Sequence, residues 1–218
     1  MSGRLVWIDL ETTGLNPRRE RILEIAIIVT EPDLAEVARY ERITEEAGVL
    51  VFGDLDPYVQ EMHTANGLWG ASCAAYRAGG NSIVQVDEQV EAWLRRILEL
   101  PEVIAHSKDR PKMAGSSVHF DREFIREHMP RTYALFSHRL YDVSSLNEFA
   151  ARALPLAYEH RPREGGVMHR AMPDIIHSLD VARHYVGRLV DYQRQVELVA
   201  EAEQRGYDRC AAQPKKVQ

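Results

Sequence analysis

Cysteine is scarce in this sequence. Among the 218 residues only Cys73 and Cys210 are cysteines, and they lie far apart in the chain. Two such residues are poor material for a disulfide framework, and their scarcity is typical of a protein from a reducing compartment. We therefore expect two free thiols and a cytoplasmic protein.

Long apolar runs are absent as well. No stretch approaches the roughly 18 apolar residues from which a membrane span is built. The apolar part of the N-terminal sequence MSGRLVWIDLE is too short for a signal peptide. The sequence therefore predicts no membrane association, while its 45% of hydrophobic residues is enough for a packed core.

Positive charge is not in excess. Lysine and arginine number 27 against 33 acidic residues, which gives a net charge of −6. Proteins that bind long nucleic acids across many phosphates are usually basic. The charge balance argues against a long, nonspecific nucleic-acid track and leaves room for a small site where a few cations or metal ions meet a phosphate.

Apolar periodicity divides the chain into strands followed by alternating helices and strands. We expect strands at residues 4–10, 21–31 and 35–52, and shorter ones at 102–107, at 116–120 and at the beginning of 139–155. Helices are expected at 86–100, at 121–129, in the rest of 139–155, and from Pro173 onward as one long helix or two. A polar loop is expected at 108–115. This order predicts an α/β fold, in which helices cover a mixed sheet.

Two acids close the first expected strand. Asp9 and Glu11 follow the apolar run of residues 5–8, and residues two apart in a strand share a face. The two carboxylates would repel each other, more strongly if they are buried. Either the strand ends in solvent with both acids exposed, or something positive lies between them.

Three further residues could complete a site with this pair. Asp121 opens an expected helix, Asp174 begins the last one, and His169 precedes it. Alone, each has an ordinary explanation, as a helix cap, a first-turn acid and a loop histidine. Together, four carboxylates and a histidine have the composition of a two-metal hydrolytic site, in which oxygen ligands select Mg²⁺ or Mn²⁺ and the histidine takes a proton from water.

The sequence resembles the DEDDh 3′→5′ exonucleases in the motifs DLE, FDREF and HRAMPD. Within them it is most similar to the oligoribonucleases, through WIDLETTGLNPRRERILEIAIIVTEPDL, HTANGL, GSSVHFDREFIREHMP and RLYDVSSLNEFA. The resemblance covers about residues 4–190. It implies a ribonuclease H-like fold with a mixed five-stranded sheet. It also implies that two metal ions are bound by Asp9, Glu11, Asp121 and Asp174, with His169 as the general base.

The same resemblance implies residues that bind the substrate. Leu15 matches a leucine that wedges between two bases, and His63 matches a histidine that packs against a base. Ser117, Arg139 and Ser144 match residues that surround the 5′-phosphate of a dinucleotide, which is chemically reasonable for two hydroxyls and a guanidinium. His138 replaces a tyrosine that stacks on the substrate in the partner subunit's site.

These features together predict an enzyme. We expect a metal-dependent 3′→5′ exoribonuclease that degrades very short single-stranded RNA to mononucleotides. Two alternatives remain: a related exonuclease that proofreads or trims longer RNA or DNA, and an inactive nucleic-acid-binding protein on the same fold. The resemblance also implies a homodimer. We expect the exonuclease domain at residues 1–190 and a C-terminal helical extension with a frayed tail at 191–218.

Overall fold

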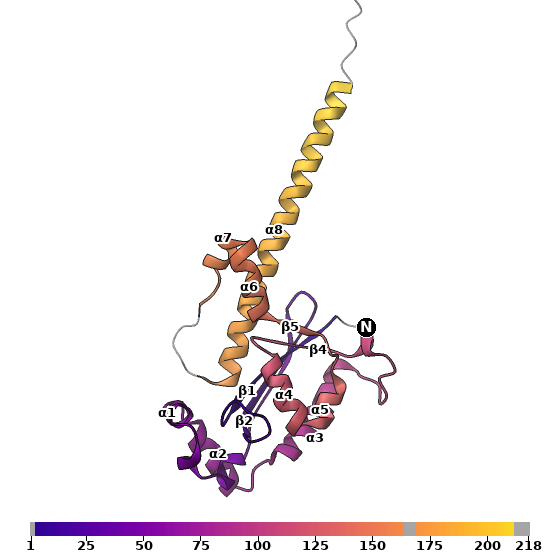
Figure 1. Ribbon diagram of the computed structural model, residues 1–218. Helices are drawn as coiled ribbons and strands as arrows, with labels where there is room; N and C mark the ends of the chain where they lie inside the picture. Colours follow the sequence, from indigo (N-terminus) through magenta and orange to yellow (C-terminus); the bar gives the residue numbers. More distant parts are fainter. Residues whose placement is uncertain (1–2, 164–168, 212–218) are drawn as a thin grey trace, which may run out of the picture.

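A five-stranded sheet forms the centre of the protein (Figure 1). The structure is a computed structural model that describes residues 3–163 and 169–211, with side chains described as far as residue 205. The strands are β1 (Leu5–Thr12), β2 (Ile22–Thr30), β3 (Glu36–Ile43), β4 (Lys112–Gly115) and β5 (Leu140–Asp142). Their order is β3-β2-β1-β4-β5, in which β1, β2 and β3 are antiparallel neighbours and the β1–β4 and β4–β5 pairs are parallel. The predicted mixed sheet of five strands is confirmed.

Eight α-helices are found in the described residues. They are α1 (Pro57–Ala65), α2 (Leu68–Arg77), α3 (Ile83–Leu98), α4 (His119–His128), α5 (Pro130–Leu135), α6 (Val143–Ala153), α7 (Pro155–Glu159) and α8 (Ala171–Ala211). Single 3₁₀ turns occur at Glu46–Val49, Phe52–Asp54 and Ser107–Asp109.

Helices cover both faces of the sheet, and β1 supplies side chains to both. Val6 and Ile8 enter a core shared with α3, α4 and α5, whereas Leu5 and Trp7 enter a second core shared with α6 and α8. This alternation follows from the two-residue repeat of a strand. Because the sheet is covered on both faces, every residue of β2 is buried. The odd-numbered residues of β1 therefore face α8, which decides where Asp9 and Glu11 point.

The C-terminal helix α8 is continuous over 41 residues and extends well beyond the rest of the protein (Figure 1). Its first part packs in the second core through Ile175, Leu179, Ala182 and Tyr185. From Gly187 to Arg205 every described side chain is exposed. Within the described part of the chain, no helix combines the length and the hydropathy that crossing a membrane requires.

Two of the expected strands are misplaced, and a third is shorter than expected. Residues 102–107 form irregular, mostly exposed chain, and residues 116–120 form a turn and the beginning of α4. The fourth strand lies instead at Lys112–Gly115, inside the segment expected to be a loop. It is only four residues long and is recognisable only because it pairs with β1 and β5. The third strand ends at Ile43, before residues 44–52, which contain 3₁₀ turns.

Two helix boundaries also differ from expectation. The helix that carries Asp121 begins at His119, so this residue lies within the first turn and is not the N-cap. The last helix begins at Ala171, two residues before Pro173, and is one helix. Cys73 is a free thiol, as expected. The side chain of Cys210 lies outside the described residues.

Candidate active site

Three carboxylates meet where β1 approaches the first turn of α8. Asp9 and Glu11 lie on the face of β1 that α8 covers, and Asp174 is the fourth residue of α8. One carboxylate oxygen from each residue lies within 4.8 Å of those of the other two. Glu11 is buried, and the other two are partly buried. The strand therefore does not end in open solvent.

Asp121 reaches the same end of β1 from α4. The backbone N–H of Leu10 donates to Oδ1 of Asp121 at 3.0 Å. Leu10 is the residue between Asp9 and Glu11, so this hydrogen bond holds the Asp121 carboxylate at the same point of β1. Its side chain is buried. It lies beside the three-carboxylate group and is not part of the set that lies within 4.8 Å.

Burial and mutual repulsion disfavour the ionised form of these acids. Burial is the main reason that the pKa of Asp9 lies well above its ordinary value, and the charge of Asp121 is the next. Burial followed by the charge of Asp174 raises the pKa of Glu11 to about 8. Burial also raises the pKa of Asp121 to about 8, although its hydrogen bond with Leu10 opposes the change. Carboxylates in this position require either protons or a cation, and their oxygens suit a hard divalent metal ion.

His169 lies two residues before α8 and has a positive φ of 38°. Its carbonyl oxygen accepts a hydrogen bond of 2.6 Å from Nδ2 of Asn66. Burial is the main reason that the pKa of His63 is lowered, and His169 contributes to the same change. The histidine and the acids are thus carried by neighbouring parts of the chain at one end of the sheet.

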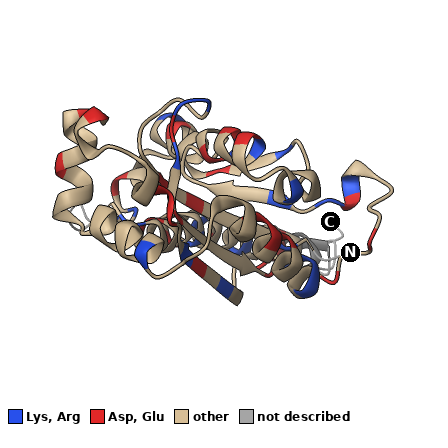
Figure 2. Cartoon of the chain, turned by 90° about the horizontal axis from the view of Figure 1, so that it is seen from below, with Lys and Arg blue, Asp and Glu red and all other residues tan. Residues whose placement is uncertain are grey.

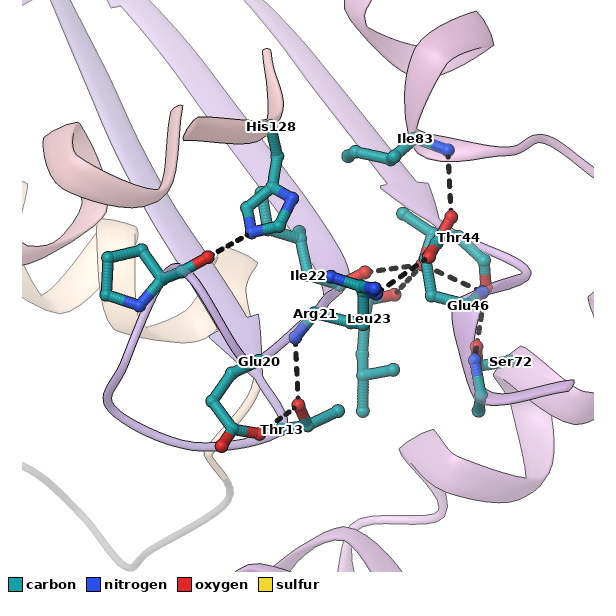
Figure 3. A network of polar contacts seen from close by, with 12 residues as sticks. Thr13, Glu20, Arg21, Ile22, Leu23, Thr44, Glu46, Ser72, Ile83 and His128 are labelled. Carbon is teal, nitrogen blue, oxygen red and sulfur yellow. Dashed lines mark hydrogen bonds and ion pairs between the residues drawn. The ribbon is translucent and has the colours of Figure 1, made fainter. Parts of the chain in front are cut away.

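A braced loop presents Leu15 to solvent. The side chain of Leu15 is 83% exposed. Thr13 Oγ1 donates to Glu20 Oε2 at 2.7 Å and accepts from the N–H of Arg21 at 2.9 Å, so both ends of the loop are tied together (Figure 3). The carbonyl oxygen of Pro17 lies 2.7 Å from Nε2 of His128, the residue that Figure 3 labels above this loop. An exposed leucine on a fixed loop is available to contact a ligand.

His63 lies beneath the end of β1. Its side chain has no exposed surface, and its Nε2 atom is 2.8 Å from the carbonyl oxygen of Thr12. Among the described residues, its Nδ1 atom is buried without a hydrogen-bond partner. In this structure the ring has no surface on which a base could pack, so the expected contact with a base stays a prediction.

Two of the three residues expected at a 5′-phosphate are in direct contact. The hydroxyls of Ser117 and Ser144 are 3.1 Å apart, and the N–H of Ser117 donates to Ser144 Oγ at 3.0 Å. Asp142 Oδ1 accepts from the N–H groups of both serines, at 3.2 and 2.8 Å. Arg139 and His138 are exposed residues immediately before β5. The structure thus brings the two serines into contact with each other. The side chain of Arg139 is exposed, five residues before Ser144 in the sequence.

Comparison with known proteins identifies the family. The model of the RNase T exonuclease family matches residues 6–182 of this chain. The chain belongs to the RNase T exonuclease family. It is therefore a 3′→5′ exonuclease and a hydrolase, and the expectation that it is an enzyme is confirmed. Enzymes of this family depend on metal ions, and the acidic group described above could bind one.

Curated relatives in this family are named oligoribonuclease. The protein of that name from Tropheryma whipplei is 33% identical over 183 residues, which are 84% of this chain and 91% of the relative. The one from Corynebacterium diphtheriae is 34% identical over 200 residues, or 92% of this chain and 86% of the relative. The resemblance expected from the motifs is confirmed.

Solved exonuclease structures share the fold. Exonuclease I from Methylocaldum szegediense superposes with a TM-score of 0.62 at 18% identity, over 85% of this chain and 40% of that one. Escherichia coli Exonuclease I in complex with a 5cy-dA13 oligonucleotide gives 0.59 at 18% identity, over 87% and 42%. This chain spans about two fifths of those proteins, so the likeness concerns the fold, which is ribonuclease H-like as expected.

Sequence reasoning missed residues of this exonuclease that hold the site together. Glu24 pairs with Arg170, Asn66 holds the carbonyl of His169, and Ser116 Oγ lies 2.8 Å from Ser178 Oγ of α8. Glu24 is the only charged residue within the apolar run of β2, which is a signal that the sequence does contain. No comparable signal marks Asn66, because its role depends on where α1 ends.

Proposed function

We propose that this exonuclease degrades very short single-stranded oligoribonucleotides to mononucleotides in the 3′→5′ direction. The observation that carries the proposal is the group of Asp9, Glu11 and Asp174 carboxylates at the end of β1, with Asp121 beside it. The names of the curated relatives support RNA as the substrate. The inactive alternative is not favoured, since the five residues of a working site are all present.

The acids are suited to two Mg²⁺ or Mn²⁺ ions. Asp9, Glu11, Asp121 and Asp174 would hold them, because divalent ions would offset the burial and the mutual repulsion that raise the pKa of Glu11 to about 8. Bound in pairs, such ions stabilise the charge that develops on the phosphate and its leaving oxygen. Oxygen ligands alone favour these hard cations over softer metals.

His169 is proposed to be the general base. A histidine can accept a proton from water near neutral pH, and a positioned base contributes roughly 10²- to 10⁴-fold to rate. Its position beside the entry of α8 supports this role, because Asp174 lies on the first turns of the same helix.

The serines are proposed to bind the 5′-phosphate of a dinucleotide together with Arg139. Charge-assisted hydrogen bonds from a guanidinium and two hydroxyls would enclose a terminal phosphate. Leu15 would contact the bases from the surface, and His63 would do so only after the residues that cover its ring move aside. Over the described residues, Figure 2 shows Lys and Arg interspersed with Asp and Glu, an arrangement suited to a ligand with few phosphates.

Three broader features belong to the same proposal. The enzyme would act in the cytoplasm as a homodimer in which His138 faces the partner's site. Residues 1–190 would form the exonuclease domain, followed by a C-terminal helical extension from residue 191, and the expected tail at its end lies outside the described residues. The exposed side chain of His138 supports the homodimer, because this side chain can reach another protein surface.

Four dissociation constants test the length preference. Wild type and Arg139→Ala are each titrated with a 5′-phosphorylated diribonucleotide and with a heptamer, in Ca²⁺ to prevent cleavage. The wild type should favour the dinucleotide, although phosphate contacts alone would favour the heptamer. Arg139→Ala should weaken dinucleotide binding about ten- to a hundredfold and affect the heptamer much less.

Arg131→Ala is the control, because Arg131 is an exposed arginine paired with Glu88 on the α3–α5 side of the protein. It should change neither constant. If the wild type prefers the heptamer and Arg139→Ala weakens both ligands equally, the enzyme instead acts on longer RNA or DNA.

A further inference from the structure

An ion pair between a buried glutamate and a partly exposed arginine lies next to the acidic site. Glu24 is opposite Glu11 in the pairing of β1 with β2, and its side chain is fully buried. Arg170 donates to both of its carboxylate oxygens, from Nε at 3.1 and 2.9 Å and from Nη2 to Oε1. An unpaired charge on the buried Glu24 would be strongly unfavourable, so this carboxylate requires the arginine.

Contacts from two sides converge on the chain that enters α8. The carboxylate of Glu24 also accepts from the N–H of Ala171 at 3.1 Å. From the other side, the amide of Asn66 donates to the carbonyl of His169 at 2.6 Å. Three consecutive residues, 169–171, are therefore held by β2 and by the end of α1.

The backbone of His169 requires such support. Its φ of 38° lies in the left-handed region, which residues with a side chain seldom adopt. A strained conformation persists where the surroundings determine it, and such residues cluster at functional sites. Because the backbone sets the direction in which a side chain leaves the chain, these contacts also decide where the imidazole can lie.

We propose that Glu24 and Arg170, with Asn66, are positioning residues that hold His169 in place for proton transfer. The inference rests on the role proposed above for His169. If the pair only stabilised the fold, replacing both charges by apolar side chains of similar size should leave kcat unchanged. Such a replacement is often neutral for stability, so the folded enzyme would still react at its normal rate.

The test replaces both partners at once. Glu24→Met/Arg170→Met removes the pair without leaving an unpaired charge, and its melting temperature should stay within about 8 °C of that of the wild type. On a dinucleotide, kcat should fall at least about tenfold, because a misplaced base loses most of its effect. KM, and the dissociation constant in Ca²⁺, should change less than about threefold.

A matched control removes an ion pair from the other end of the same strands. Arg4 Nε donates to Glu31 Oε1 at 3.0 Å, beyond the beginning of β1 and the end of β2. Arg4→Met/Glu31→Met should leave kcat unchanged. A fall in kcat equal to that of the Glu24 variant would mean that loss of any ion pair slows the enzyme, and would overturn the inference.

Combination with His169→Ala decides whether the pair acts through the histidine. If it does, adding the Glu24→Met/Arg170→Met change to His169→Ala should lower kcat by less than about twofold. Effects that multiply would overturn the inference, because the pair would then act by another route. A slow His169→Ala with an unchanged pair variant would overturn it and leave the proposed function standing. A fully active His169→Ala would refute the proposed base and this inference together.

Arg170→Lys tests the same point in a protein that keeps its charges. Lysine preserves the positive charge but lacks the two fixed N–H donors that meet the Glu24 carboxylate. The kcat of Arg170→Lys should fall severalfold, and its KM should stay unchanged. If the methionine variant is unfolded at the assay temperature, the Arg170→Lys result alone decides whether the inference holds. Full kcat in Arg170→Lys and in the methionine variant would refute the inference.

Discussion

Replacing Glu11 by glutamine should make the metal-free protein more stable at alkaline pH while it abolishes catalysis. The side chain is 7% exposed, and the folded protein raises its pKa from 4.5 to about 8. A carboxyl whose pKa is raised by folding binds its proton more tightly in the folded state. Its stabilising effect is therefore complete below about pH 4.5 and is lost as the pH rises toward about 8.

The magnitude follows from the same values. One pH unit between the two pKa values corresponds to about 1.4 kcal/mol. Between about pH 5.5 and about pH 8, ionisation of Glu11 should lower the free energy of unfolding of the metal-free wild type by about 3 kcal/mol. Glu11→Gln keeps a neutral side chain throughout and should avoid this loss. The variant should be about 3 kcal/mol more stable than the wild type at about pH 8, and similar to it at about pH 5.5.

Urea unfolding in the presence of EDTA measures the effect at both pH values. Added Mg²⁺ should stabilise the wild type by binding only the folded state, and should stabilise the variant less. Glu148→Gln, an exposed carboxylate of α6, is the control and should alter stability by less than about 0.5 kcal/mol. The reasoning fails if the metal-free wild type does not lose stability over this pH range, or if Glu11→Gln is the less stable protein at about pH 8.

Three further predictions concern single side chains. Asp174→Asn should lower the rate of hydrolysis more than about a hundredfold and weaken Mn²⁺ binding in calorimetry, whereas Asp180→Asn, exposed on the same helix, should change neither. Leu15→Ala should raise KM for a dinucleotide severalfold without changing the melting temperature, because the side chain is 83% exposed; an unchanged KM would remove Leu15 from the substrate site. Leu94→Ala, at a fully buried position of α3, should cost about 2–5 kcal/mol in urea unfolding and leave kcat unaltered while the protein is folded.

The sequence by itself determined the features that depend on one element at a time. The two-residue repeat of a strand places Asp9 and Glu11 on one face wherever that strand lies. The motif that carries His169 and Asp174 belongs to the entry of one helix, so both are delivered to the same place. Alternating strands and helices were enough to predict a mixed sheet, because local periodicity reflects the geometry of each element.

The tertiary structure decided what depends on partners distant in the chain. The four residues of β4 have no strand signal of their own and become a strand because β1 and β5 lie on either side of them. Glu24 meets Arg170 across 146 positions of sequence, and Asn66 meets His169 across 103. Such contacts are fixed by strand register and by helix packing, and no local pattern of residues encodes either of them.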